Sequence, residues 1–115
     1  MKLKIYEIKV IELLLKNKLS ENEWMKFLDI CDTIDIDYEY TGAGYFLKLK
    51  ITNLNLKKAT LDTPTVIGET KNFTVGFIIY TDQNEIVIEC HSWSEFNPPK
   101  NMRELDIEIK IINLN

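Results

Sequence analysis

The chain has 115 residues, of which 45% are hydrophobic and 28% charged, and this is the composition of one soluble domain with its own core. Eighteen acidic residues against 14 basic ones give a formal net charge of -4. That balance argues against general nucleic-acid binding, which needs a cationic surface. No apolar run reaches the ~18 residues that a membrane span requires.

The first residues do not predict a signal peptide, because Glu7, Lys9 and Glu12 interrupt the apolar positions. The two cysteines, Cys31 and Cys90, are too few for a disulfide framework. We expect buried, reduced thiols rather than a bridge or a redox pair. These features favour a cytoplasmic location.

A helix is expected at the start of the chain and should end near Asn17. Its evidence is a run of apolar residues at three- and four-residue spacing, namely Ile5, Ile8, Ile11, Leu14 and Leu15. A strand is the competing interpretation, because Leu3 with Ile5, and Ile8 with Val10, also fit a period of two.

The second helix has a sharper start, because Ser20 and Glu23 fit a capping box. In that motif the serine oxygen accepts from the Glu23 amide, and the Glu23 side chain reaches back to Ser20. The helix should end near Cys31 or Asp32. Its apolar stripe comprises Trp24, Phe27, Leu28 and Cys31.

From Thr33 the apolar period changes to two, which predicts strands. Thr41-Gly42-Ala43-Gly44 supplies a turn, because glycine tolerates positive φ angles. We read residues 53–58 as a polar connection and 65–70 as a short strand that begins after Pro64. The other expected strands are 34–40, 45–51, the hairpin 73–81 and 85–93 around Asp82-Gln83-Asn84, and 105–111 after a Pro-Pro loop.

This order predicts one α+β domain over residues 1–115, with two N-terminal helices packed on a mostly antiparallel meander of about six strands. We expect the core to combine both layers. Its predicted members are Leu47, Leu49, Phe77, Ile79, Ile86 and Ile88 from the strands, with Trp24, Phe27 and Leu28 from the second helix.

Glu89 and the only histidine, His91, should share one strand face, with side chains about 7 Å apart. Such a pair could move a proton or supply half of a metal site. Zinc needs three or four ligands, however, and Cys90 should point to the opposite face. Nor do Ser92, Ser94 or the glycine turn match a nucleophile elbow or a phosphate loop. We therefore expect no metal, no cofactor and no enzyme activity.

Two surface features are candidates for binding a protein partner. The acids Asp29, Asp32, Asp35, Asp37 and Glu39 fall within eleven residues that contain no base. They form either an ordinary solvated surface or a patch that steers a basic partner. Trp93 and Phe96 place aromatic area on a loop, which is either a binding anchor or a cap on the core.

The chain also resembles a group of small uncharacterised bacterial proteins. The residues that carry the resemblance lie between Tyr40 and Glu95. They form a G-x-G-[FY]-[FY] element and a later G-F, Glu and aromatic series, here Gly42, Gly44, Tyr45, Phe46, Gly76, Phe77, Glu89, Trp93 and Glu95. His91 and Trp93 stand where similar proteins often have tyrosines. Some proteins of this layout are immunity proteins of toxin systems, so the resemblance implies that class.

Three functions follow as expectations. The first is a non-enzymatic immunity protein that neutralises a toxin with a basic surface by direct binding. The second is a small-molecule binder or minor enzyme that uses Glu89 and His91. The third is a structural protein that homodimerises through an uncovered sheet edge.

Overall fold

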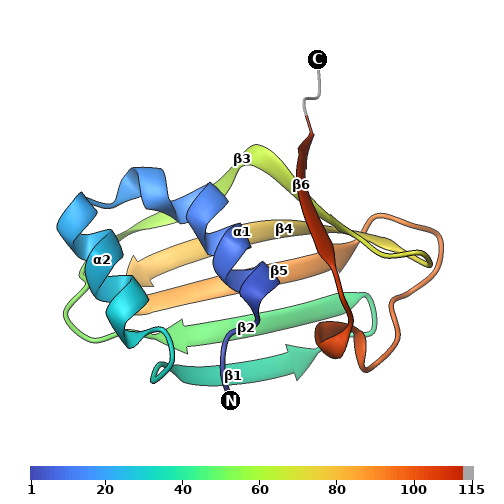
Figure 1. The fold of residues 1–115 in the computed structure, drawn as a ribbon, viewed down its shortest axis with the longest axis horizontal. Helices are drawn as coiled ribbons and strands as arrows, with labels where there is room; N and C mark the ends of the chain where they lie inside the picture. Colours follow the sequence, from blue (N-terminus) through green and yellow to red (C-terminus); the bar gives the residue numbers. More distant parts are fainter. Residues whose placement is uncertain (113–115) are drawn as a thin grey trace.

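The computed structural model describes residues 1–112 and has two layers (Figure 1). Helices α1 (Ile5–Leu15) and α2 (Glu21–Ile30) lie on one face of a six-stranded antiparallel sheet. The short 3-10 helix η1 (Lys16–Lys18) connects them. The predicted α+β class is confirmed, and the first segment is a helix rather than a strand.

Helix α1 buries part of the predicted apolar run, namely Ile11, Leu14 and Leu15. Ile5 is 88% exposed, so its assignment to the buried face is wrong, and Ile8 is only half-buried. Glu7 is fully buried instead, and it lies one turn before Val10 and Ile11 on the face that contacts the sheet. The apolar pattern therefore located the helix but not its exact orientation, because a carboxylate occupies a core position.

Helix α2 begins as predicted. The Glu23 amide donates to Ser20 Oγ at 3.1 Å, and the Ser20 amide donates to Glu23 Oε1 at 2.8 Å. This reciprocal capping satisfies two of the free amides at the helix start. Trp24 and Phe27 are buried and stack with ring centroids 5.4 Å apart. Leu28 is 37% exposed, so its assignment to the core is wrong.

The strands are paired in the order β1-β2-β5-β4-β3-β6, and every pairing is antiparallel. Strand β5 thus lies between β2 of the β1-β2 hairpin and β4, and β6 returns to pair with β3 at the other end of the sheet. The strands are β1 (Asp35–Tyr40), β2 (Gly44–Lys50), β3 (Leu56–Glu69), β4 (Thr74–Gln83), β5 (Glu85–Ser92) and β6 (Glu108–Ile112).

Strand β3 corrects the sequence analysis. The predicted polar connection at 53–58 overlaps its start, and the short strand predicted at 65–70 is only its second half. Pro64 lies inside the strand rather than before it. The pairing of β3 with β4 is interrupted between Leu61 and Val66, so the proline, which has no backbone N–H to donate, occupies the irregular stretch.

The β4-β5 hairpin is confirmed, and Asp82 pairs with Glu85 around a tight turn. The last strand begins later than predicted. The chain first forms the 3-10 helix η2 (Met102–Glu104), and β6 starts at Glu108 rather than at residue 105. Met102 is fully buried in the core, which explains why this segment turns inward before the strand.

The core lies between the helices and the inner face of the sheet. It contains Trp24, Phe27 and all six of the predicted strand residues. The alternation of buried and exposed residues along β2, β4 and β5 leaves the other face of the sheet, which we call the outer face, without a helical layer among residues 1–112 (Figure 1).

Candidate functional site

The outer face carries most of the predicted site residues. Tyr38 and Tyr40 of β1 pack against the core, so the alternating Asp35, Asp37 and Glu39 point to the outer face. We call these three acids the acidic row. The register places Lys50 opposite Asp35 and Lys48 opposite Asp37, as the alternation suggested.

The two lysines form no ion pair with the acidic row. Lys48 Nζ forms its ion pair with Glu85 Oε1 of β5, at 3.3 Å. Glu39 faces Phe46, which has no charge. Within residues 1–112 none of the three acids takes part in an ion pair. The edge of the sheet therefore presents negative charge that the described part of the fold leaves open to a partner.

Glu89 lies on the outer face, two strands in from the acidic row, opposite Phe46 on one side and Ile78 on the other. Its Oε1 accepts a hydrogen bond of 2.9 Å from the Tyr80 hydroxyl. That hydrogen bond, with burial and the negative charge of Glu89, raises the pKa of Tyr80. The carboxylate thus faces an aromatic hydroxyl.

His91 and Trp93 are hydrogen-bonded to each other on the outer face. Trp93 Nε1 donates to His91 Nε2 at 3.0 Å, and the Trp93 amide donates to the Thr74 carbonyl at 2.8 Å. The indole lies over Gly76, where an added Cβ would stand 2.3 Å from Trp93 Nε1. Glycine is therefore required beneath the ring. Trp93 is still 45% exposed, so part of its surface is available for contact.

The remaining predicted residues do not join this surface in one patch. Asp29 is in the last turns of α2 and Asp32 is in the turn after it, so both belong to the helical layer. Phe96 is 73% exposed in the loop after β5, and its carbonyl accepts from the hydroxyls of Ser92 and Ser94. The five acids are thus split between two surfaces.

A buried ion pair was missing from the sequence analysis. Glu7 is fully buried and Arg103 is 5% exposed. Arg103 Nε donates to Glu7 Oε2 at 2.9 Å, and Nη2 donates to Oε1 at 2.8 Å. The Tyr45 hydroxyl donates to Oε2 at 2.7 Å. The position of Glu7 on the buried side of α1 indicates that its carboxylate needs a partner. The sequence does not reveal that partner, because it lies 96 residues away.

Electrostatics within this network follow from burial and from the Glu7 charge. Burial disfavours the Arg103 cation, but the hydrogen bonds to Glu7 and the attraction of its charge outweigh that effect and raise the pKa of Arg103. Burial, followed by the charge of Glu7, raises the pKa of both Tyr45 and Tyr6. Both phenols therefore remain neutral hydrogen-bond donors at physiological pH.

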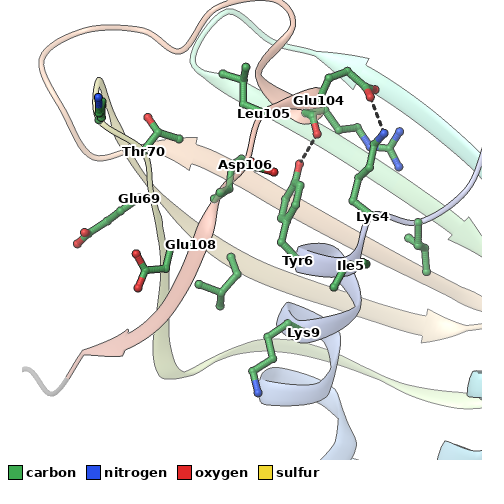
Figure 2. A pocket seen from close by; sticks show the side chains of 15 residues that line it. Lys4, Ile5, Tyr6, Lys9, Glu69, Thr70, Glu104, Leu105, Asp106 and Glu108 are labelled. Atoms are coloured by element: carbon green, nitrogen blue, oxygen red, sulfur yellow. Dashed lines mark hydrogen bonds and ion pairs between the residues drawn. The ribbon is translucent and has the colours of Figure 1, made fainter.

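A groove of about 1100 Å³ lies between the start of α1 and β6 (Figure 2). Tyr6 stands in it, and its hydroxyl donates to the Arg103 carbonyl at 3.1 Å. Lys4 crosses the rim to pair with Glu104, whereas Glu69 and Glu108 point away from Tyr6. Neither Glu89 nor His91 lines this groove. Because its charged groups have both signs and are partly paired, the groove does not define one ligand chemistry.

The remaining candidates for chemistry are metal-ligating side chains and the two cysteines. In residues 1–112 no cluster of three or more His, Cys, Asp or Glu side chains could hold a metal ion. Both cysteines are free thiols; Cys90 is buried as predicted, whereas Cys31 is half-buried rather than buried. Burial, followed by the negative charges of Glu7 and Glu89, raises the pKa of Cys90, which keeps that thiol protonated.

The arrangement is that of a two-layer α+β protein whose outer sheet face carries an acidic edge and an ordered histidine–tryptophan pair. No family model, curated protein or solved structure matches the chain. Among the helices of the described residues, none has the length and apolar character needed to cross a membrane.

Proposed function

We propose that this chain is a cytoplasmic, non-enzymatic binding protein of the immunity type. In this proposal it neutralises a bacterial toxin by covering a basic surface of the toxin with its own outer face. The observation that carries the proposal is the acidic row of β1, which has no ion pair within the described chain and lies on the same face as Trp93.

Charge complementarity selects the kind of partner. The acidic row is part of a chain whose net charge is -4, and carboxylates without an ion pair on an exposed edge attract a basic surface over about a Debye length. A second copy of this chain is disfavoured at that edge, because pairing β1 with itself would bring two acidic rows together. A basic protein is therefore the occupant that this face favours.

Trp93 supplies the short-range part of the interface. Its indole is held by the hydrogen bond to His91 and by the close approach to Gly76, so little side-chain freedom remains to be lost on binding. Tryptophans of this kind are frequent binding hot spots. The acids provide steering, and the aromatic ring provides a contact from which water is excluded.

Several contacts support a binding role over catalysis by Glu89 and His91. Each of these side chains is hydrogen-bonded to an aromatic residue of the same face, Glu89 to Tyr80 and His91 to Trp93. The groove of about 1100 Å³ lies elsewhere, beside α1 and β6. A substrate would have to displace these contacts, whereas a protein partner can dock over them.

The test is binding kinetics against the protein encoded by the gene adjacent to this one, measured at low and high salt. The charge-reversal variant Asp35→Lys with Asp37→Lys should slow association and weaken its salt dependence. The matched control is Asp29→Lys with Asp32→Lys, which makes the same charge change on the helical layer. This control should lower the association rate less than the change at Asp35 and Asp37, because it leaves the charge of the proposed interface unchanged.

Trp93→Ala should mainly speed dissociation, by an amount equivalent to about 2 kcal/mol or more if the residue is a hot spot. Far-UV circular dichroism of each variant checks that the fold is retained. Equal effects of the two charge reversals, together with an unchanged dissociation rate for Trp93→Ala, would reject the outer face as the interface.

A further inference from the structure

We propose that the His91–Trp93 hydrogen bond is a pH-sensitive latch that fixes the binding surface at neutral pH and releases Trp93 when His91 is protonated. This inference rests on the proposed function for its biological meaning. The latch itself is a property of the free chain and is tested there.

The direction of the hydrogen bond fixes the proton on the imidazole. An indole N–H only donates, so His91 Nε2 must be the acceptor in the 3.0 Å contact with Trp93 Nε1. A neutral imidazole then carries its proton on Nδ1. That atom is buried and has no hydrogen-bond partner among the described residues. The pair is therefore formed by one tautomer of the neutral ring.

Protonation removes the acceptor. An imidazolium carries N–H groups on both nitrogens, so its Nε2–H would face the Trp93 N–H and the hydrogen bond could not form. The indole cannot relieve this conflict by moving toward the sheet, because it already lies against Gly76. It must move away from the strand, which changes the surface that a partner meets.

Moving the indole away from the strand costs free energy, so a second interaction besides the hydrogen bond holds the ring in place. Ile67 pairs with Gly76 in the neighbouring strand and faces the outer side, yet it is only 4% exposed and does not belong to the main core. It is the cross-strand neighbour of Gly76, the residue over which the indole lies. Lifting Trp93 exposes apolar surface, which is unfavourable. The neutral imidazole of His91 therefore holds the ring in place together with this burial, whereas the imidazolium works against it.

The charged groups around His91 are few. On β2 its cross-strand neighbour is Gly44, and on β4 it is Gly76, so neither strand places a charge opposite the ring. Along β5 the next residue on this face is Glu89, whose Oε1 accepts from Tyr80. On the far side of Ile67, Lys110 is paired with Glu69 at 3.1 Å. Glu89 is thus the charged neighbour that β5 places on this face.

The experiment follows the two indole N–H resonances of the free protein by NMR from pH 8 to pH 5. The Trp93 resonance should move with the same midpoint as the His91 ring protons, and the protection of this N–H against exchange, relative to the intrinsic exchange rate at each pH, should fall. The buried Trp24 resonance should stay in place, and constant circular dichroism shows that the fold persists. The matched variant is His91→Gln, whose amide oxygen can accept but does not titrate, so the Trp93 resonance should lose its pH dependence.

A Trp93 resonance that stays fixed while His91 titrates would overturn the latch, and so would a pH-dependent shift that survives in His91→Gln. Binding of the adjacent-gene protein gives a separate readout. Loss of one hydrogen bond predicts affinity weakened by up to about tenfold at pH 5 in the wild type but not in His91→Gln. Absence of binding at pH 8 rejects the proposed function, whereas the NMR result still decides the latch.

Discussion

Substituting Glu7 gives the sharpest test of how this fold is held together. Glu7→Gln removes the charge but keeps the shape of the side chain. Arg103, which is 5% exposed, then loses its carboxylate partner. Breaking a buried ion pair costs about 3–5 kcal/mol, because the remaining charge is buried without compensation. Domains of this size have a total stability of about 5–15 kcal/mol, so the expected loss is a large fraction.

The measurement is urea denaturation followed by circular dichroism, with the slope checked so that a change in midpoint reports a change in stability. The control is Glu85→Gln, which removes the half-exposed pair with Lys48 and should cost no more than about 1 kcal/mol. The compensating variant is Glu7→Leu with Arg103→Met, which removes both charges and should recover most of the loss.

Two results would refute this reasoning. One is a cost for Glu7→Gln as small as that for Glu85→Gln, which would mean that Arg103 finds water or another acceptor. The other is a double variant Glu7→Leu with Arg103→Met that is less stable than Glu7→Gln. In that case the network would be stabilising beyond its charges, for example through the Tyr45 hydroxyl, which donates to Glu7.

Three further outcomes are expected. Ile88→Ala should lower the free energy of unfolding by about 2–5 kcal/mol, because Ile88 is fully buried, whereas Leu28→Ala should cost far less; equal costs in a urea series would refute the core assignment. Ser20→Ala should cost about 1 kcal/mol, because the Glu23 amide loses its acceptor, and unchanged thermal unfolding would contradict the cap. Cys31 should react with a thiol reagent faster than Cys90, whose pKa burial raises further; the native protein should show one accessible thiol and the unfolded protein two.

Local patterns in the sequence predicted the elements whose causes are local. The capping box of α2, the glycine turn before β2 and the β4-β5 hairpin depend on residues a few positions apart, and each is confirmed. The period of two also assigned Asp35, Asp37 and Glu39 to one face of β1. These features need no knowledge of what packs against them.

The features that the sequence analysis missed depend on contacts between distant residues. The length of β3 is set by its neighbours β4 and β6, which pair with it across the Pro64 irregularity. The partner of Glu7 comes from η2, and no local pattern links the two. In the same way, the tie between His91 and Trp93 could be suspected from their spacing, but the fit of the indole over Gly76 needed the register of β4 and β5.

The separation of Glu7 and Arg103 has a consequence for how the chain is made. The helix that carries Glu7 is synthesised first, and its guanidinium partner follows 96 residues later. Because an unpaired carboxylate resists burial, we expect α1 to dock stably on the sheet only after Arg103 has been translated. Docking of the first helix is thereby tied to the synthesis of η2. We expect a nascent chain halted before Arg103 to hold a sheet on which helix α1 is still undocked.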